Sequence, residues 1–333
     1  MGGQRSAGGR RGPGPPAIWR SNGDGWRALP MAPVSFYGQR AVLYDVSTAG
    51  DQLVAVGWAS GGAHGNPRTA TWWSGGQSVD EQAADFEVFG GPRAIDVVDV
   101  VPVAGSWVIL GNRSNERGRP GGALWQAADG RAFGLVDAPA LASGDNETVR
   151  LDGVTALADG SLVAVGGRST PGREDEPIAW SSSDGRTWGR EDVGELVPEN
   201  TRLARPLSRV VATPTHAVAL GIEDEGPRQT YRSAVRDAAG RWRLGESFSE
   251  TSNDELPRVG ALSAVGDRVV ALVKVAEQYE LWWSDNGTDW TKGRLPDPVA
   301  ADSLTMTALA GDERELRLAV TGADGAHLWS AHR

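Results

Sequence analysis

The chain of 333 residues contains no cysteine. This absence excludes thiol nucleophiles, disulfide bridges and thiolate metal sites, but it leaves the compartment open because a large core needs no disulfides. No apolar run approaches the roughly 18 to 20 residues of a bilayer-spanning helix, and no apolar signal-peptide core follows Met1. We therefore predict no transmembrane segment.

Basic residues are outnumbered by acidic ones. The chain has 33 Lys and Arg against 43 Asp and Glu, a net charge of -10, whereas phosphate backbones are bound by clustered positive charge. We therefore predict no nucleic-acid partner. The four histidines, His64, His216, His327 and His332, lack metal-ligand spacing. Walker loops, glycine-rich dinucleotide turns and Gly-x-Ser-x-Gly elbows are missing as well, so we predict no metal and no cofactor.

What the chain does contain is turn-forming residues and tryptophan. It has 45 Gly, 19 Pro and 14 Trp, with 40% hydrophobic residues, a composition that favours a real core built from short strands. Residues 1–16 are low-complexity Gly, Pro and Arg, and we predict a disordered tether there. Such a tether suits an exported domain of a high-GC bacterium, so we expect an extracellular or surface-anchored protein, with the cytoplasm as the alternative.

A repeat of about fifty residues runs through the rest of the chain. Short apolar strands, most of them ending in Gly, recur six times: LVAVG from Leu53, WVILG from Trp107, LVAVG from Leu162, AVALG from Ala217, VVALV from Val269 and LRLAVTG from Leu316. A strand with Trp or Tyr follows each of them: ATWWS from Ala70, ALWQA from Ala123, IAWSS from Ile178, TYRSA from Thr230, LWWSD from Leu281 and HLWSA from His327. This period matches the four-stranded blades of a propeller.

Each repeat predicts strands a, b, c and d of one antiparallel sheet. The a–b pair occurs six times, while the N-terminal segment supplies a c–d pair that could complete the last sheet and cover its edge. We therefore predict an all-β fold, a single six-bladed β-propeller domain over residues 17–333, with seven blades as the alternative. We expect a monomer.

The turns between strands c and d carry a family resemblance. SSDGRTW from Ser182, SDNGTDW from Ser284 and AADGRAF from Ala127 resemble the Asp-box, or BNR, repeats of sialidase-like propellers, although each is one residue shorter than the usual pattern. The assigned turn residues are Ser182, Asp184, Gly185, Trp188, Ser284, Asn286, Gly287, Trp290, Asp129, Gly130 and Phe133. We expect these residues to be scaffold, because the polar side chains suit turn hydrogen bonds and Gly suits a positive φ. The resemblance implies that ligands bind on the opposite face.

That opposite face would carry the b–c loops and the start of the innermost strands. Arginines precede or begin five a strands, and aspartates follow them: Arg40, Arg93, Arg150, Arg209 and Arg258, with Asp45, Asp96, Asp99 and Asp152. Converging arginines would bind a carboxylate, sulfate or phosphate group. The alternative, which we favour, is that Arg–Asp pairs line a channel and fix the register of the blades.

The same resemblance also suggests that the protein is an enzyme, a glycoside hydrolase. A sialidase-like enzyme needs an arginine cluster, a Tyr nucleophile activated by Glu, and a general acid. The family's Arg-Ile-Pro signature is missing. Tyr279 has glutamates beside it but lies far out in a blade, and Tyr44 has no nearby glutamate in sequence. We therefore expect a non-catalytic binding module for a protein or an anionic glycan, with a glycoside hydrolase and a structural subunit of a surface assembly as alternatives.

Overall fold

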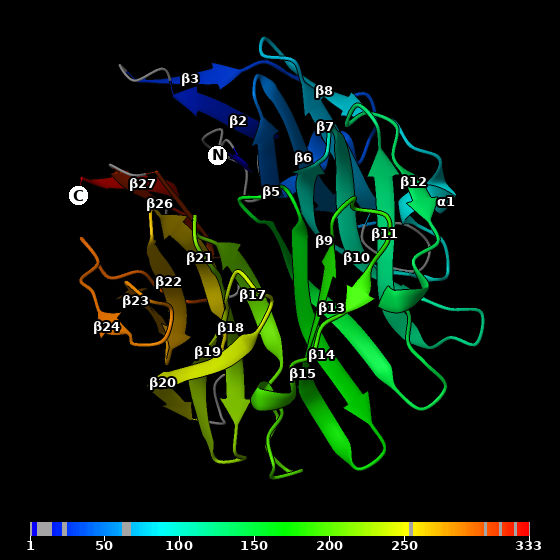
Figure 1. Ribbon diagram of the computed structural model, residues 1–333. Coiled ribbons are helices and arrows are strands. Elements are labelled where there is room, and N and C mark those ends of the chain that lie inside the picture. The colour runs from blue at the N-terminus through cyan, green and yellow to red at the C-terminus, as the bar shows by residue number, and fades with distance from the viewer. Residues whose placement is uncertain are drawn as a thin grey trace. The chain divides into compact units, whose positions relative to one another are not determined.

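The computed structural model describes residues 2–4, 15–21, 25–61, 68–252, 256–302, 305–312, 315–322 and 325–332. They fall into two compact units, Met1–Ala142 and Ser143–Arg333 (Figure 1). Within the described residues the only α-helix is the four-residue α1, and no helix has the length and apolar character needed to span a membrane. Residues 5–14 of the predicted tether lie outside the described residues, so the tether stays a prediction.

The first unit contains three sheets. The first has β1 (Gly2–Gln4), β2 (Pro16–Ser21) and β3 (Trp26–Leu29). The second has β4 (Met31–Ala32), β5 (Val42–Ala49), β6 (Gln52–Ala59), β7 (Arg68–Ser74) and β8 (Val79–Gln82). The third has β9 (Ala94–Val103), β10 (Ser106–Ser114), β11 (Pro120–Ala127) and β12 (Gly134–Val136). The short helices are η1 (Gly38–Arg40), α1 (Phe86–Phe89) and η2 (Pro139–Leu141).

The second unit contains four sheets and the short helix η3 (Gly194–Leu196). The first two are β13 (Thr148–Ala156), β14 (Leu162–Thr170), β15 (Arg173–Ser182) and β16 (Gly189–Arg190), then β17 (Leu207–Ala212), β18 (Ala217–Asp224), β19 (Arg228–Arg236) and β20 (Trp242–Ser252). The others are β21 (Val259–Val265), β22 (Arg268–Val275), β23 (Gln278–Ser284) and β24 (Thr291–Lys292), then β25 (Met306–Gly311), β26 (Glu315–Gly322) and β27 (Gly325–His332).

These sheets confirm the predicted fold class, an all-β six-bladed propeller of four-stranded antiparallel sheets. The described residues contain six a–b hairpins, from β5–β6 to β25–β26, and five of them continue into strands c and d. The predicted N-terminal c–d pair is β2 and β3, which pair with each other. Its predicted role in completing the sixth sheet concerns the two units together and stays a prediction.

The repeated glycine at the end of strand b has a structural reason. A β-bulge interrupts strand a opposite Gly57, Gly111, Gly166 and Gly221. A bulge bends its strand and brings backbone close to the neighbouring strand. A Cβ atom on Gly57 would lie only 2.8 Å from the Val42 carbonyl oxygen. A Cβ atom on any of the other three would overlap a carbonyl oxygen in strand a or, for Gly221, just before it. Only glycine leaves room for this approach.

The core fills the space between neighbouring sheets. In the first unit, Val54 and Val56 of β6 pack with Ile109 of β10 and Trp125 of β11. In the second unit, Val163 and Val165 of β14 form the same kind of cluster with residues of β17 to β20. The c-strand tryptophans Trp72, Trp125 and Trp180 are fully buried. The alternating inward residues therefore supply the packing that holds successive sheets together.

Candidate active site

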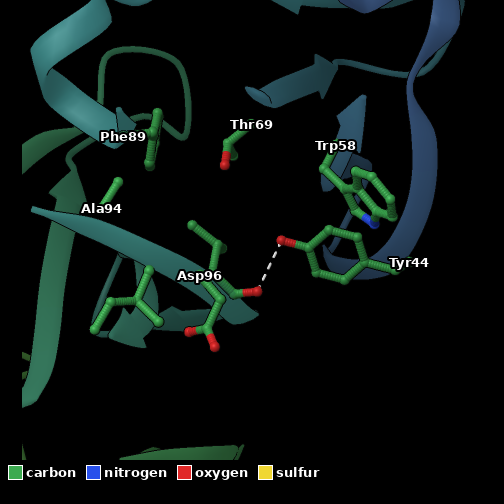
Figure 2. Close-up of a pocket in the computed structure, with 8 residues that line it drawn as sticks. Tyr44, Trp58, Thr69, Phe89, Ala94 and Asp96 are labelled. Carbon is green, nitrogen blue, oxygen red and sulfur yellow. Dashed lines mark hydrogen bonds between the residues drawn. The ribbon is translucent and has the colours of Figure 1, made fainter. Parts of the chain in front are cut away.

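A pocket lies in the first unit, at the end of the sheets that carries the b–c loops. It has a volume of about 200 Å³ and is lined by Tyr44 of β5, Trp58 of β6, Thr69 of β7, Phe89 of α1 and the residues 94–97 that begin β9. Figure 2 shows Phe89 and Tyr44 on opposite sides of the pocket, with Trp58 beside Tyr44. The side chain of Trp58 is 39% exposed, so it offers an aromatic face to a ligand.

Two side chains of β5 reach across to the next sheet. The Tyr44 hydroxyl donates to the Val97 carbonyl oxygen at 2.9 Å, as the dashed line in Figure 2 shows. The Asp45 carboxylate accepts from the Val100 backbone N–H at 2.7 Å. Tyr44 is the bulged residue of its strand. The bulge therefore directs Tyr44 and Asp45 at β9 and fixes the pocket wall.

Aspartates gather around this connection. Asp99 has the same position after the bulge of β9 that Asp45 has on β5, since Asp45 pairs with Val56 and Asp99 with Leu110. Because Asp45 binds the N–H of Val100, its carboxylate lies beside the backbone next to Asp99. Both carboxyl groups act electrostatically on Tyr44, so both lie within reach of its phenol.

Asp96 supplies a third carboxyl group and lines the pocket itself. The side-chain amide of Asn112, a buried residue opposite it on β10, donates to Asp96 at 2.8 Å. This bond holds the carboxylate in one orientation. Carboxyl groups held in this way can donate or accept protons from a bound ligand.

The phenol of Tyr44 stays protonated. Its pKa is raised well above the ordinary value, first by burial and then by the negative charges of Asp45, Asp99 and Asp96. A tyrosine nucleophile needs the opposite effect, a neighbour that favours loss of its proton. Tyr279, the other tyrosine considered, is buried on β23 and contacts Arg258. Tyr44 therefore does not meet the requirement of a sialidase-like nucleophile.

The predicted arginines of the first unit lie outside the pocket lining. The Arg40 guanidinium lies 5.2 Å from the Phe36 ring centroid, at the end of η1. Arg93 forms an ion pair of 3.4 Å with Glu116 of the b–c loop, and both side chains are exposed. An exposed pair of this kind contributes little to stability.

The predicted arginines of the second unit bind nearby strands. Arg150 donates two bonds from Nε to the Asp152 carboxylate, at 2.8 and 2.9 Å. Arg209 donates to the Asp152 carbonyl oxygen at 3.1 Å, and Arg258 contacts the Tyr279 hydroxyl. The Arg150–Asp152 contact is the pairing that the favoured alternative expected. An anion site made by all five arginines involves both units and stays a prediction.

The polar side chains of the Asp-box-like turns accept hydrogen bonds from backbone groups of the same turn. The Ser182 hydroxyl accepts from Gly185 N–H at 2.9 Å, and Asp184 accepts from two further N–H groups of the same turn. Ser284 and Asn286 repeat this pattern with Gly287 and residues 288 and 289. In the third copy Asp129 accepts from Arg131 N–H at 3.1 Å. The glycines have φ near +70° to +77°, and Trp188 and Phe133 are buried.

Sequence reasoning named Tyr44, Asp45, Asp96 and Asp99 but did not identify Trp58 and Phe89 as pocket residues. Trp58 and Phe89 end short elements next to loops, where a single aromatic carries no repeat signal. No group of three or more His, Asp or Glu side chains in the described part of the chain could hold a metal ion. The residues that line the pocket offer carboxyl, hydroxyl and indole groups.

Comparison with known proteins gives the fold a context. No family model matches the sequence, and no curated protein is similar to it. A GH93 α-L-arabinofuranosidase of Fusarium graminearum, solved with arabinobiose, has 12% identity and a TM-score of 0.54, covering 92% of this chain and 96% of that one. An α-L-arabinanase of Penicillium chrysogenum has 12% identity and a TM-score of 0.54, covering 91% and 96%.

A PL25 ulvan lyase, at 10% identity, has a TM-score of 0.56 and covers 96% of this chain and 87% of its own. At such identities the likeness establishes the propeller fold alone. The leading expectation from the sequence, a non-catalytic binding module, is nevertheless wrong. The arabinofuranosidase and the arabinanase, which share the fold over more than nine-tenths of both chains, are glycoside hydrolases.

Proposed function

We propose that the protein is a glycoside hydrolase and that the pocket of the first unit is its active site. The observation that carries the proposal is the convergence of Asp45, Asp96 and Asp99 around Tyr44, beside a half-exposed tryptophan. Glycosidases cleave their substrates with a pair of Asp or Glu residues. The glycoside hydrolases that share this fold support the same class of reaction.

The pocket suits one sugar ring. Its volume of about 200 Å³ equals that of roughly seven water molecules in the liquid. The Trp58 indole and the Tyr44 ring provide an apolar wall for the faces of a sugar, and Asp96 and Thr69 provide polar atoms for its hydroxyl groups. A neutral Tyr44 contributes a wall and a fixed hydroxyl, and no charge.

The reaction needs two carboxyl groups in different protonation states. One donates its proton to the glycosidic oxygen as the bond to the anomeric carbon breaks. The other, ionised, either activates a water molecule or attacks the anomeric carbon directly, and water finally supplies the new hydroxyl group. Asp96 lines the pocket, so it is the first candidate for contact with the glycosidic bond, and Asp45 and Asp99 are the candidates for its partner.

The test uses single substitutions and a broad panel of glycosides, including arabinan and arabinobiose. Asp45→Asn, Asp96→Asn and Asp99→Asn are compared with Asp129→Asn, which removes a carboxylate from a c–d turn of the same unit. General acid–base groups contribute about 10²- to 10⁴-fold, so at least two of the first three variants should lose that much kcat while Asp129→Asn keeps its activity. Release of an unsaturated sugar, or no turnover of any glycoside, would refute the proposal.

A further inference from the structure

An exposed aromatic surface adjoins the pocket. Phe36 is 63% exposed and Phe86 is 50% exposed, and the Phe36 ring contacts Tyr37 edge-on at 5.4 Å. The Arg68 guanidinium lies between two of these rings, 4.2 Å from the Phe86 centroid and 5.5 Å from that of Tyr37. We call Phe36, Tyr37, Arg68 and Phe86 the aromatic ledge. Arg68 precedes the pocket residue Thr69 in β7, and Phe86 lies in α1 with the pocket residue Phe89, so the ledge and the pocket share two elements.

The ledge is held in place from below. Glu81 of β8 is buried, and its carboxylate accepts from the backbone N–H groups of Val34 at 2.6 Å and Ser35 at 2.8 Å. The Ser35 hydroxyl then accepts from Gly38 N–H at 2.8 Å. A buried carboxylate thus fixes the segment that presents Phe36 to solvent. Exposed apolar patches on a fixed surface mark binding sites.

The arginines at the ledge make no ion pair within the described residues. Among the described residues, no carboxylate pairs with Arg68 or Arg40, whose guanidinium groups contact aromatic rings instead. Residues 62–67, which precede Arg68, contain no Asp or Glu. Arg93, Arg150 and Arg236, by contrast, pair with acids. On a chain with a net charge of -10, two unpaired guanidinium groups at one place favour an anionic ligand.

We infer that the aromatic ledge is a subsite for an acidic sugar unit, so that the substrate is a polysaccharide carrying carboxylate or sulfate groups. This inference rests on the proposed hydrolase function. The sugar faces would contact Phe36 and Phe86, while the anionic group binds the free edge of the Arg68 guanidinium. The neighbouring unit of the same polymer would lie in the pocket beside Trp58.

Calorimetric binding of three polymers tests the inference: polygalacturonate carries carboxylates, dextran sulfate carries sulfates, and arabinan is neutral. Arg68→Gln is compared with Arg131→Gln, which removes the same charge from an arginine stacked 3.7 Å over Trp73 in the same unit. We expect wild type to bind at least one acidic polymer more tightly than arabinan. Arg68→Gln should weaken that binding about tenfold or more, because hydrogen bonds to charged groups are strong, while Arg131→Gln should change it by less than about twofold.

Thermal unfolding of each variant shows whether it is folded, and Arg40→Gln, at an exposed residue, replaces Arg68→Gln if the latter unfolds. Equal losses in the ledge variant and Arg131→Gln, or binding of arabinan as tight as that of both acidic polymers, would overturn the inference. A protein that binds an acidic polymer through Arg68 yet cleaves no glycoside would keep this inference and refute the hydrolase. A protein that cleaves glycosides but depends neither on Arg68 nor on polymer charge would refute this inference and keep the hydrolase.

Discussion

Replacing Gly111 by alanine should damage both the fold and the pocket. A Cβ atom on Gly111 would overlap the Asp96 carbonyl oxygen and lie 2.9 Å from the Val97 Cα. Carbon atoms pack at about 3.5 Å or more, so β9 would have to retreat by at least roughly 0.6 Å at Asp96 and Val97, two of its four residues that line the pocket. Overpacking of this kind costs about 1 to 3 kcal/mol. A shift approaching 1 Å in a site can cost about 10²-fold in rate.

The matched control is Gly134→Ala, in β12 of the same sheet, where an added Cβ meets nothing within 4 Å. Urea unfolding should show Gly111→Ala less stable than wild type by about 1 to 3 kcal/mol. Gly134→Ala should be unchanged or more stable by up to about 1 kcal/mol, since alanine lowers the entropy of the unfolded chain. If the two variants unfold at the same urea concentration and bind polymer equally, the bulge explanation of the repeated glycine fails.

Three further predictions concern single side chains. Tyr44→Phe should keep kcat within about tenfold of wild type on any glycoside that is cleaved, because a protonated phenol is no nucleophile; a loss of about 10³-fold or more would contradict this. Backbone N–H groups of the turn lower the pKa of Asp184 to about 2, below the value near 3.9 of an unfolded chain. The stabilisation it gives should therefore be complete above about pH 4 and lost as the pH falls toward 2. The melting temperature of Asp184→Asn should lack this pH dependence, whereas that of Asn286→Asp should show an additional pH dependence of the same kind. Glu81→Gln should lower the free energy of unfolding by about 1 to 3 kcal/mol and weaken polymer binding, measured by urea titration and calorimetry; unchanged values would show that Glu81 does not hold the ledge.

The fold could be predicted from sequence because its signals are local. Strand, turn and aromatic recur within each fifty-residue repeat, so their order shows in the chain itself. The pocket depends on contacts between repeats: Tyr44 and Val97 are 53 residues apart, and Asp45 and Val100 are 55 apart. No pattern within a single repeat encodes that pairing.

The arginines show why spacing alone misleads. Their similar distances from the a strands suggested equivalent positions, but each bulge shifts the register by one residue. Arg150 precedes the bulge of β13 and Arg209 follows that of β17, so the two side chains serve different contacts. Arg68 escaped notice because it begins a c strand, where the repeat draws attention to tryptophan.

The bulge also explains why the repeat is not uniform. In the sheet of β21 to β24, Val273 takes the position of the strand-b glycine, and the bulged residue is itself a glycine, Gly260. A Cβ there would overlap the Tyr279 ring and lie 2.8 Å from the Thr307 hydroxyl. In the five sheets with a bulge, glycine therefore occupies the point where strands a and b approach most closely. It lies on strand b in four of these sheets and on strand a in the sheet of β21 to β24.

With the bulge as the common reference, the residue that follows it can be compared across five sheets. That position holds Asp45 and Asp99 in the two sheets of the first unit, and then Gly153, Arg209 and Ala261 in the second. A purely architectural role at this position would allow the same residue type in every copy, because the backbone geometry repeats. Carboxyl groups occur only where the pocket lies. The departure from the repeat, more than the repeat itself, therefore supports the proposal that acid–base chemistry takes place between β5 and β9.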